Sequence, residues 1–118
     1  MNFKVNDKEP IYLQIITHIK QSIVTGDLKP GDTIPSRREL AEMLRVNPNT
    51  VQRAYKEMEN MELINTVRNF PSSITTDDKI LKSIRTDLIK ESLDVFINNM
   101  KAIKVPKSEI IELIENKY

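Results

Sequence analysis

The sequence predicts a mainly α-helical fold with one small β-hairpin, and two observations carry this prediction. Apolar residues recur at intervals of three and four along several stretches, which is the spacing of helices that bury one face. Residues 63–68 and 73–76 are instead rich in β-branched side chains and flank a segment that contains a proline, as strands around a turn do. We therefore expect three helices before the hairpin and two after it.

The composition is that of a globular protein. Of the 118 residues, 39% are hydrophobic and 30% are charged, and cysteine is absent, which excludes disulfides and Cys-ligated metals. The N-terminus lacks the apolar stretch of a signal peptide. No apolar run approaches the ~20 residues that cross a bilayer, so we expect a cytoplasmic protein without membrane contact.

The charge balance gives little indication of a partner. Eighteen Lys and Arg residues face seventeen Asp and Glu residues, for a net charge of +1. Nucleic-acid-binding proteins usually carry a basic excess. A case for DNA must therefore rest on where the charges lie.

The first helix is expected over residues 11–25. Its apolar stripe consists of Ile11, Tyr12, Ile15, Ile16, Ile19 and Ile23, and Gly26 is a suitable C-terminal stop. Pro30 and Gly31 then fit the central positions of a type II turn, because glycine accepts a positive φ. Residues 33–34 could form a short strand.

A second helix is expected to start at Ser36. Ser36 and Glu39 have the spacing of a capping box, in which each side chain accepts a hydrogen bond from the other's backbone N–H. Leu40, Ala41 and Leu44 would form its buried side.

The third helix starts within the segment VNPNTVQRAY, residues 46–55. Asn47 is a favourable N-cap, and Pro48 falls at the first helical position, where its missing N–H is harmless. The buried stripe would consist of Val51, Ala54, Met58 and Met61. The polar face, displaced around the helix, would consist of Asn49, Gln52, Arg53 and Lys56.

This polar face has the chemistry of a DNA-reading surface. Asn and Gln can pair bidentately with adenine in the major groove, and Arg can pair with guanine or a phosphate. Thr50 could reach a phosphate or a thymine methyl group. A short helix, a tight turn and a second helix with a free polar N-terminal face form a helix-turn-helix. The alternative is an ordinary amphipathic helix with a solvated face.

The surrounding motifs favour the helix-turn-helix. The run GDLKPGDTIPSRRELAEMLRVNPNTVQRAYKEMENMELI resembles the winged helix-turn-helix of the GntR family of bacterial transcription regulators. The shared motifs are Gly-x-Leu-x-Pro-Gly at 26–31, Pro-Ser-x-Arg-x-Leu-Ala at 35–41 and Thr-Val at 50–51, preceded by a similar entry to the first helix at 10–15. The Asn-Pro-Asn-Thr-Val segment and the short C-terminal part are similar to the YtrA-like subfamily.

The resemblance implies DNA contacts from both helices of the motif and from the wing. The candidates are Ser36, Arg37, Arg38, Asn47, Asn49, Thr50, Gln52, Arg53, Lys56 and Arg68. Three of these have alternative roles. Ser36 could serve mainly as a cap, while Arg38 could pair with Glu42 and Arg53 with Glu57, each four residues further along a helix.

The sequence departs from the family pattern at three places. The segment RNFPSS, residues 68–73, replaces the usual Gly-x-Gly of the wing turn; Asn69 accepts a left-handed conformation but Pro71 does not. Met61-Glu62 replaces the usual Glu-Gly before the first wing strand. Arg45 stands where helix-turn-helix proteins often have glycine, at a cost of ~1 kcal/mol if it is left-handed.

We divide the chain into a winged helix-turn-helix at 1–76 and a two-helix region at 77–118. This tail is too small to enclose a ligand pocket of the usual ~300 Å³ or more by itself. The resemblance implies a homodimer formed through the tail, with candidate contacts at Ile84, Leu88, Val95, Phe96, Met100, Ile110 and Ile114. The alternative is an intramolecular five-helix bundle.

The expected function is that of a dimeric regulator, acting as a repressor on an inverted-repeat DNA operator. By resemblance alone, it would control a transporter operon of the ABC type. The single histidine, His18, and the lack of a Gly-rich loop argue against an enzyme, and no residue indicates a metal, a cofactor or an identifiable small-molecule effector. The alternative function is a winged-helix protein-interaction module, which the near-neutral charge favours slightly.

Overall fold

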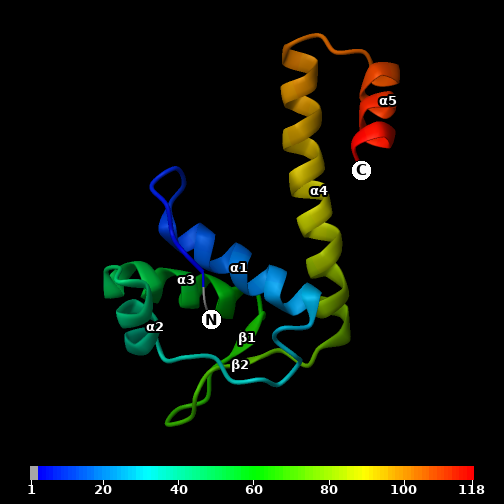
Figure 1. Cartoon of the computed structure of the whole chain (residues 1–118). Coiled ribbons are helices and arrows are strands. Elements are labelled where there is room, and N and C mark those ends of the chain that lie inside the picture. The colour runs from blue at the N-terminus through cyan, green and yellow to red at the C-terminus, as the bar shows by residue number, and fades with distance from the viewer. Residues whose placement is uncertain (1–2) are drawn as a thin grey trace. The chain divides into compact units, whose positions relative to one another are not determined.

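The computed structural model describes residues 3–118 and contains the expected helices and hairpin. The elements are α1 (Ile11–Thr25), α2 (Arg37–Leu44), α3 (Pro48–Asn60), β1 (Ile64–Asn65), β2 (Ser73–Ile74), α4 (Asp78–Ala102) and α5 (Lys107–Lys117) (Figure 1). The chain forms two compact units that divide within α4, the first ending at Arg85 and the second spanning Thr86–Tyr118. The predicted boundary between residues 76 and 77 lies before α4, within the first of these units.

Helix α1 forms the base on which α3 packs. It buries Ile15, Ile16 and Ile19, three residues of the expected stripe. Gly26 ends the helix with φ 86°, and its N–H donates to the carbonyl of Ile23. Because glycine has no Cβ, it adopts this left-handed conformation without strain, and the predicted end of the helix is confirmed.

The turn between α2 and α3 is made by a left-handed arginine. Arg45 has φ 56° and follows the last residue of α2. The Val46 N–H donates to the Ala41 carbonyl at 3.1 Å and the Arg45 N–H to the Glu42 carbonyl at 3.3 Å, which satisfies the end of the helix. Arg45 is thus left-handed although it is not glycine, which is the case for which a cost of ~1 kcal/mol applies.

The wing is a short antiparallel hairpin. Ile64 of β1 lies opposite Ile74 of β2, and both side chains are buried. The strands are shorter than predicted because the chain already turns at residues 67–70, where the Phe70 N–H donates to the Val67 carbonyl. The strand expected at residues 33–34 is reduced to an isolated bridge between Thr33 and Ser73.

The core of the first unit joins α1, α2, α3 and the wing. Its fully buried large side chains are Tyr55, Ile15, Ile19, Leu40, Met58, Leu63, Ile74 and Val51. Met61 was expected in the stripe of α3, but it is 41% exposed. The helical period stops applying there because Met61 is the C-cap and the next residue, Glu62, is left-handed with φ 60°.

The second unit consists of the distal part of α4 and of α5. Lys104 is left-handed with φ 59°, and the Val105 N–H donates to the Met100 carbonyl, so the chain reverses before Pro106 opens α5. No residue between 86 and 118 is buried. Within residues 3–118, no helix has the length and apolar character of a membrane span.

Candidate nucleic-acid interface

The start of α2 is fixed by the predicted capping box. The Ser36 hydroxyl accepts the Glu39 N–H at 3.1 Å, and the Glu39 carboxylate accepts the Ser36 N–H at 3.2 Å. The capping role of Ser36 is therefore confirmed. Its hydroxyl remains exposed at the surface, so a contact with a phosphate is compatible with the cap.

The start of α3 is built as predicted from Asn47 and Pro48. The Asn47 side-chain oxygen accepts the Asn49 N–H at 2.8 Å, and Pro48 is the first helical residue. The cap uses only the oxygen of this amide, so its NH₂ group remains able to donate outward.

The two sides of α3 differ sharply in exposure. Val51, Ala54, Tyr55 and Met58 are buried, all at 0% exposure, which fixes the helix against the rest of the domain. The side chains displaced around the helix are exposed or half-exposed: Asn47, Asn49, Thr50, Gln52, Arg53 and Lys56. The structure thus gathers six of the predicted site residues on one surface, at and after the N-terminus of α3.

Arg38 is free to leave its partner on α2. Its Nε lies 4.0 Å from the Glu42 carboxylate, and the two side chains are 88% and 76% exposed. Exposed pairs of this kind contribute little to stability, about 0–1 kcal/mol. The alternative role of Arg38 in a helix ion pair is therefore energetically weak, and its guanidinium can reach a phosphate at little cost.

Arg37 is used inside the protein. Its guanidinium pairs with the Glu59 carboxylate of α3 and lies 5.1 Å from the centre of the Tyr55 ring. Its Nε is buried and has no acceptor among residues 3–118, and only 32% of the side chain is exposed. Arg37 therefore ties α2 to α3, and its position does not support the direct DNA contact predicted for it.

Tyr55 provides a second tie between the same elements. Its hydroxyl donates to the Pro35 carbonyl, immediately before α2. Burial raises the pKa of Tyr55 well above its usual range, so the hydroxyl keeps its proton at physiological pH and remains a donor. The Arg37–Glu59 ion pair and the Tyr55–Pro35 hydrogen bond together fix the position of α3 relative to the start of α2.

Arg53 is held by two partners rather than the one predicted. Its Nε lies 3.5 Å from Glu57, and its guanidinium stacks over the Tyr12 ring at 3.8 Å and donates to the Tyr12 hydroxyl at 3.1 Å. Tyr12 was placed in the apolar stripe of α1, and nothing in local spacing reveals this contact across 41 residues. The contact aligns Arg53 beside Thr50, along an open hollow between α1 and α3.

The wing tip carries Arg68 and two apolar residues, Val67 and Phe70. Arg68 is exposed, and Asn69 is left-handed with φ 70°, a conformation that asparagine tolerates. Phe70, which was not among the predicted site residues, is 70% exposed. The tip also borders a hollow shared with Ser36 and Glu39 at the start of α2, so the wing and the helix-turn-helix open onto the same surface.

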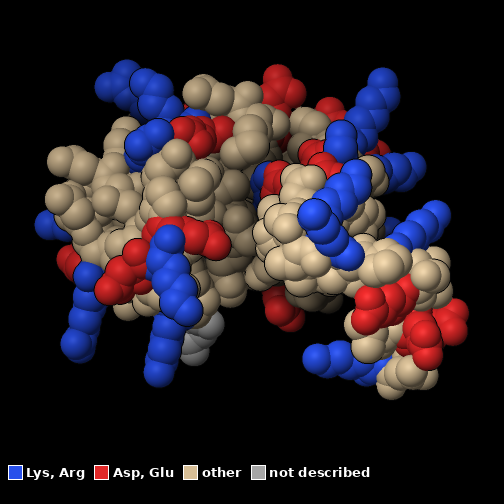
Figure 2. Space-filling view, turned by 90° about the horizontal axis from the view of Figure 1, so that it is seen from above, with Lys and Arg blue, Asp and Glu red and all other residues tan. Residues whose placement is uncertain are grey.

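The remaining side chains that the structure describes do not form a metal site. His18 stacks on Phe3 with ring centres 4.1 Å apart, and burial lowers the pKa of His18, as fits a boundary residue. Among the residues that the structure describes, no three His, Cys, Asp or Glu side chains gather as a metal site would require. Figure 2 shows Lys and Arg interspersed with Asp and Glu over one face, consistent with the near-neutral total.

Comparisons with known proteins agree with this geometry. Residues 11–70 match the family described as bacterial regulatory proteins, gntR family. The chain is 44% identical over 89 residues to the HTH-type transcriptional repressor YtrA of Bacillus subtilis, covering 75% of this chain and 68% of YtrA. It is 37% identical over 115 residues to the uncharacterized HTH-type transcriptional regulator YhcF of the same species, covering 98% and 95%.

A solved structure extends the similarity to the whole fold. A GntR family transcriptional regulator from Listeria monocytogenes superposes with a TM-score of 0.87 at 38% identity, covering 97% of this chain and 100% of that one. The mainly helical architecture with a winged helix-turn-helix is thereby confirmed, as is the expectation that the chain is not an enzyme. The chain belongs to the GntR family of DNA-binding transcription regulators.

Proposed function

We propose that this regulator represses transcription by binding an inverted-repeat operator as a homodimer. The observation that carries the proposal is the division of α3 into a fully buried face and an exposed face of amide, hydroxyl and basic side chains. A helix fixed on one side presents the other without a large loss of backbone freedom on binding, which favours sequence reading.

The contacts divide by chemistry and position. Asn49 and Gln52 would read base edges in the major groove, because their amides both donate and accept. Thr50, Arg38 and Lys56 would contact phosphates, which fix the register on the duplex. Arg53, aligned by Tyr12, would reach a phosphate or a guanine at the edge of the same surface.

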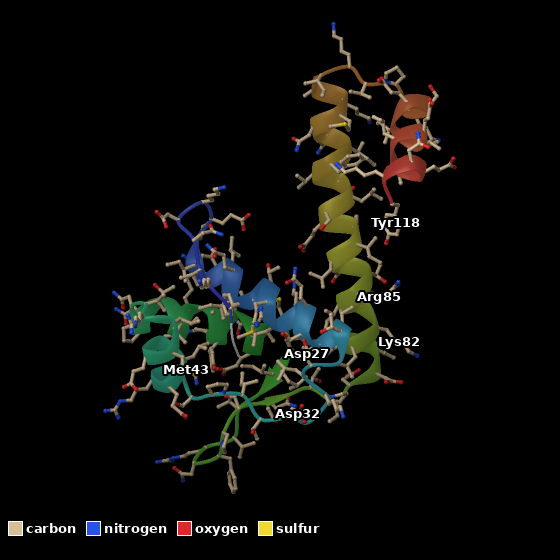
Figure 3. The ribbon with its side chains drawn as sticks, in the orientation of Figure 1. Asp27, Asp32, Met43, Lys82, Arg85 and Tyr118 are labelled. Atoms are coloured by element: carbon tan, nitrogen blue, oxygen red, sulfur yellow. The ribbon has the colours of Figure 1, made fainter. Side chains whose placement is uncertain are left out.

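The second unit supplies the reason for a dimer. An apolar groove of about 280 Å³ is lined by Phe96, Met100, Ile110, Leu113, Ile114, Lys117 and Tyr118, the last lying at the end of α5 (Figure 3). Five of its seven lining residues are large and apolar, and a solvated groove of this kind is stabilised when another apolar surface covers it. We propose a second copy of the chain as that cover.

The predicted dimer contacts divide between the two units. Val95 and Ile114 are 61% and 46% exposed, and Leu88, Phe96, Met100 and Ile110 are half-exposed, so all six are available to a partner. Ile84 is only 3% exposed and lies in the first unit, so it is part of that unit's own core. Two copies would place two recognition helices on half-sites about 10 bp apart, or a multiple of this.

Repression would follow from occupancy of the operator, which blocks polymerase. The similarity to a protein named a repressor supports repression over activation. The YtrA-like resemblance points to a transporter operon of the ABC type. Binding to chromosomal DNA also implies a cytoplasmic location.

The test starts from a duplex that the protein itself selects from a random library. We expect the selected sequences to share an inverted repeat. We also expect the logarithm of the association constant to fall linearly with the logarithm of the salt concentration, with a slope of roughly −0.9 per phosphate contacted. A library that yields no shared sequence, even at low salt, would contradict the proposal and leave a protein-interaction module as the better function. Non-palindromic selected sites would contradict the dimer alone.

A further inference from the structure

The tip of the wing, residues 67–71, is a hydrogen-bonded turn with an apolar surface. The Phe70 N–H donates to the Val67 carbonyl at 3.0 Å, and the hydroxyls of Thr66 and Ser72 hydrogen-bond at 2.8 Å below the turn. Ser72 is buried, and its carbonyl accepts the Ile34 N–H at 2.9 Å. The base of the tip is therefore anchored to the domain.

The side chains above this base are left in solvent. Phe70 is 70% exposed and Val67 is 60% exposed, the two highest values among the large apolar residues of the first unit that the structure describes. Pro71 beside them is also exposed. An anchored turn with unpacked apolar side chains is better explained by a contact with another molecule than by the stability of the domain.

The tip lies on the side of the domain that faces DNA in the proposed function. Phe70 and Pro71 border a hollow of about 540 Å³ together with Thr33, Ile34, Pro35, Ser36 and Glu39. Figure 1 shows the loop between β1 and β2 extending away from the helices of the domain. With α3 in the major groove, the hollow would accommodate the sugar-phosphate strand that separates the two grooves, and the tip would meet the minor groove.

Charge and size favour DNA over a protein as the occupant. Residues 63–76 contain no Asp or Glu and one basic residue, Arg68, so the hairpin itself carries no charge that repels phosphates. The one carboxylate that borders the hollow, that of Glu39, accepts the Ser36 N–H. A stable protein interface buries ~800 Å² on each partner, whereas one aromatic side chain buries ~150–250 Å². Two apolar side chains and a proline are too few for such an interface, but a single apolar side chain suffices to open a base step.

We propose that Phe70 enters the minor groove as an apolar wedge that partly unstacks one base step and bends the duplex. Val67 would pack on a neighbouring sugar and Arg68 would contact a phosphate. Wedges of this kind bend DNA by roughly 20–90°, with the lowest cost at pyrimidine–purine steps. This inference rests on the proposed function, because it requires a specific complex with DNA.

The test uses the full chain and the duplex selected by the wild-type protein. The duplex carries 2-aminopurine at successive positions to report unstacking and a fluorophore pair at its ends to report bending. We expect wild type to raise the 2-aminopurine signal at one step in each half-site and to shorten the end-to-end distance. Phe70→Ala should abolish both signals and weaken binding about tenfold, because stacking on one base is lost.

Two further variants make the result specific. Phe70→Trp keeps a large apolar ring and should keep the bend and the 2-aminopurine signal. Val24→Ala removes another exposed apolar side chain, 40% exposed at the last turn of α1, and should change neither. Circular dichroism should show an unchanged fold for all three variants, because each substituted side chain lies at the surface and outside the buried core.

The possible outcomes distinguish a failure of the proposed wedge from a failure of the proposed DNA-binding function. If Phe70→Ala binds and bends the duplex as wild type does, the wedge is wrong while the DNA-binding function stands. Weaker binding with an unchanged bend and no loss of 2-aminopurine signal would also overturn the wedge, leaving a simple surface contact. If wild type selects no duplex, the proposed function and the wedge both fail.

Discussion

The two units of this regulator handle apolar surface in opposite ways. The fourteen buried apolar side chains that the structure describes lie between Ile15 and Ile84, within the first unit. From Thr86 onwards no residue is buried, although α4 and α5 carry exposed Ile89, Leu93, Val95, Ile111, Leu113 and Ile114. The first unit closes on a core of its own, and the second leaves its apolar side chains to solvent.

This difference supports the physical role proposed for each unit. A closed core holds α3 rigidly, so its polar face can be specific for a sequence at low entropic cost. A helical pair without a core is stabilised only when something covers it, so it is suited to joining two chains.

The largest effect is expected from Ile114→Glu in the groove of the second unit. A buried carboxylate in an apolar interface is strongly unfavourable, so the dimer should separate into monomers. Binding to a duplex with two half-sites should then weaken by about 100-fold or more, because the second half-site no longer binds as part of the same molecule. Sedimentation equilibrium measures the first effect and fluorescence anisotropy the second.

Asn116→Glu is the matched control for this change. It adds the same charge on the same helix, two residues away and outside the lining of the groove. It should leave both the dimer and the affinity as in wild type. A dimeric Ile114→Glu variant would show that the two-chain interface lies elsewhere.

The next effect is expected from Gln52→Ala in the first unit. One bidentate contact with a base discriminates by ~1–3 kcal/mol, so affinity for the selected duplex should fall about 10- to 100-fold. The free energy of unfolding should stay unchanged, because Gln52 is exposed. Asn60→Ala, at the far end of the same helix, should change neither quantity, and equal losses from both variants would argue against base reading by Gln52.

A smaller effect, on the free energy of unfolding, is expected to differ between alanine substitutions of the adjacent Arg37 and Arg38 of α2. Arg37→Ala removes the tie to Glu59 and the stacking on Tyr55, and should lower the free energy of unfolding by ~1–2 kcal/mol. Arg38→Ala should change it by less than ~0.5 kcal/mol, because that side chain is 88% exposed. Urea unfolding measures this difference.

The affinities for DNA should show the reverse order. Arg38→Ala should weaken binding and lower the salt slope by about one, as expected for a lost phosphate contact. Arg37→Ala should keep the wild-type salt slope. A lowered slope in Arg37→Ala would restore the DNA contact that the sequence predicted for this residue.

The contrast between these arginines shows which features the sequence could predict. The capping box at Ser36 and the cap at Asn47 depend on neighbouring residues, and both were predicted correctly. The contacts Arg37–Glu59 and Arg53–Tyr12 join residues 22 and 41 positions apart. They depend on how α2 and α1 cross α3, which helical periodicity does not determine.

Met61 was placed wrongly for a related reason. The three-and-four spacing continues to Met61, but spacing alone does not say where a helix ends. The end is set by the backbone at Glu62, and the departure from the Glu-Gly family pattern concealed it, since glycine would have marked the stop. The exposure of Phe70 was not predicted, because it depends on how the wing turn projects from the domain, which local sequence patterns do not determine.

The smallest effect is expected from Glu62→Gly at the end of α3. The Leu63 N–H donates to the Met58 carbonyl and the Glu62 N–H to the Glu59 carbonyl, both at 2.9 Å, which is the Schellman pattern around a left-handed residue. A non-glycine residue costs ~1–2 kcal/mol in this conformation, and glycine costs ~0.5–1 kcal/mol of backbone entropy, so unfolding should become harder by ~0.5–1 kcal/mol. Glu62→Ala removes the carboxylate but keeps the Cβ, and should give no such gain in urea unfolding. Equal gains from the two variants would mean that the charge of Glu62, and not its backbone, is the source of the strain.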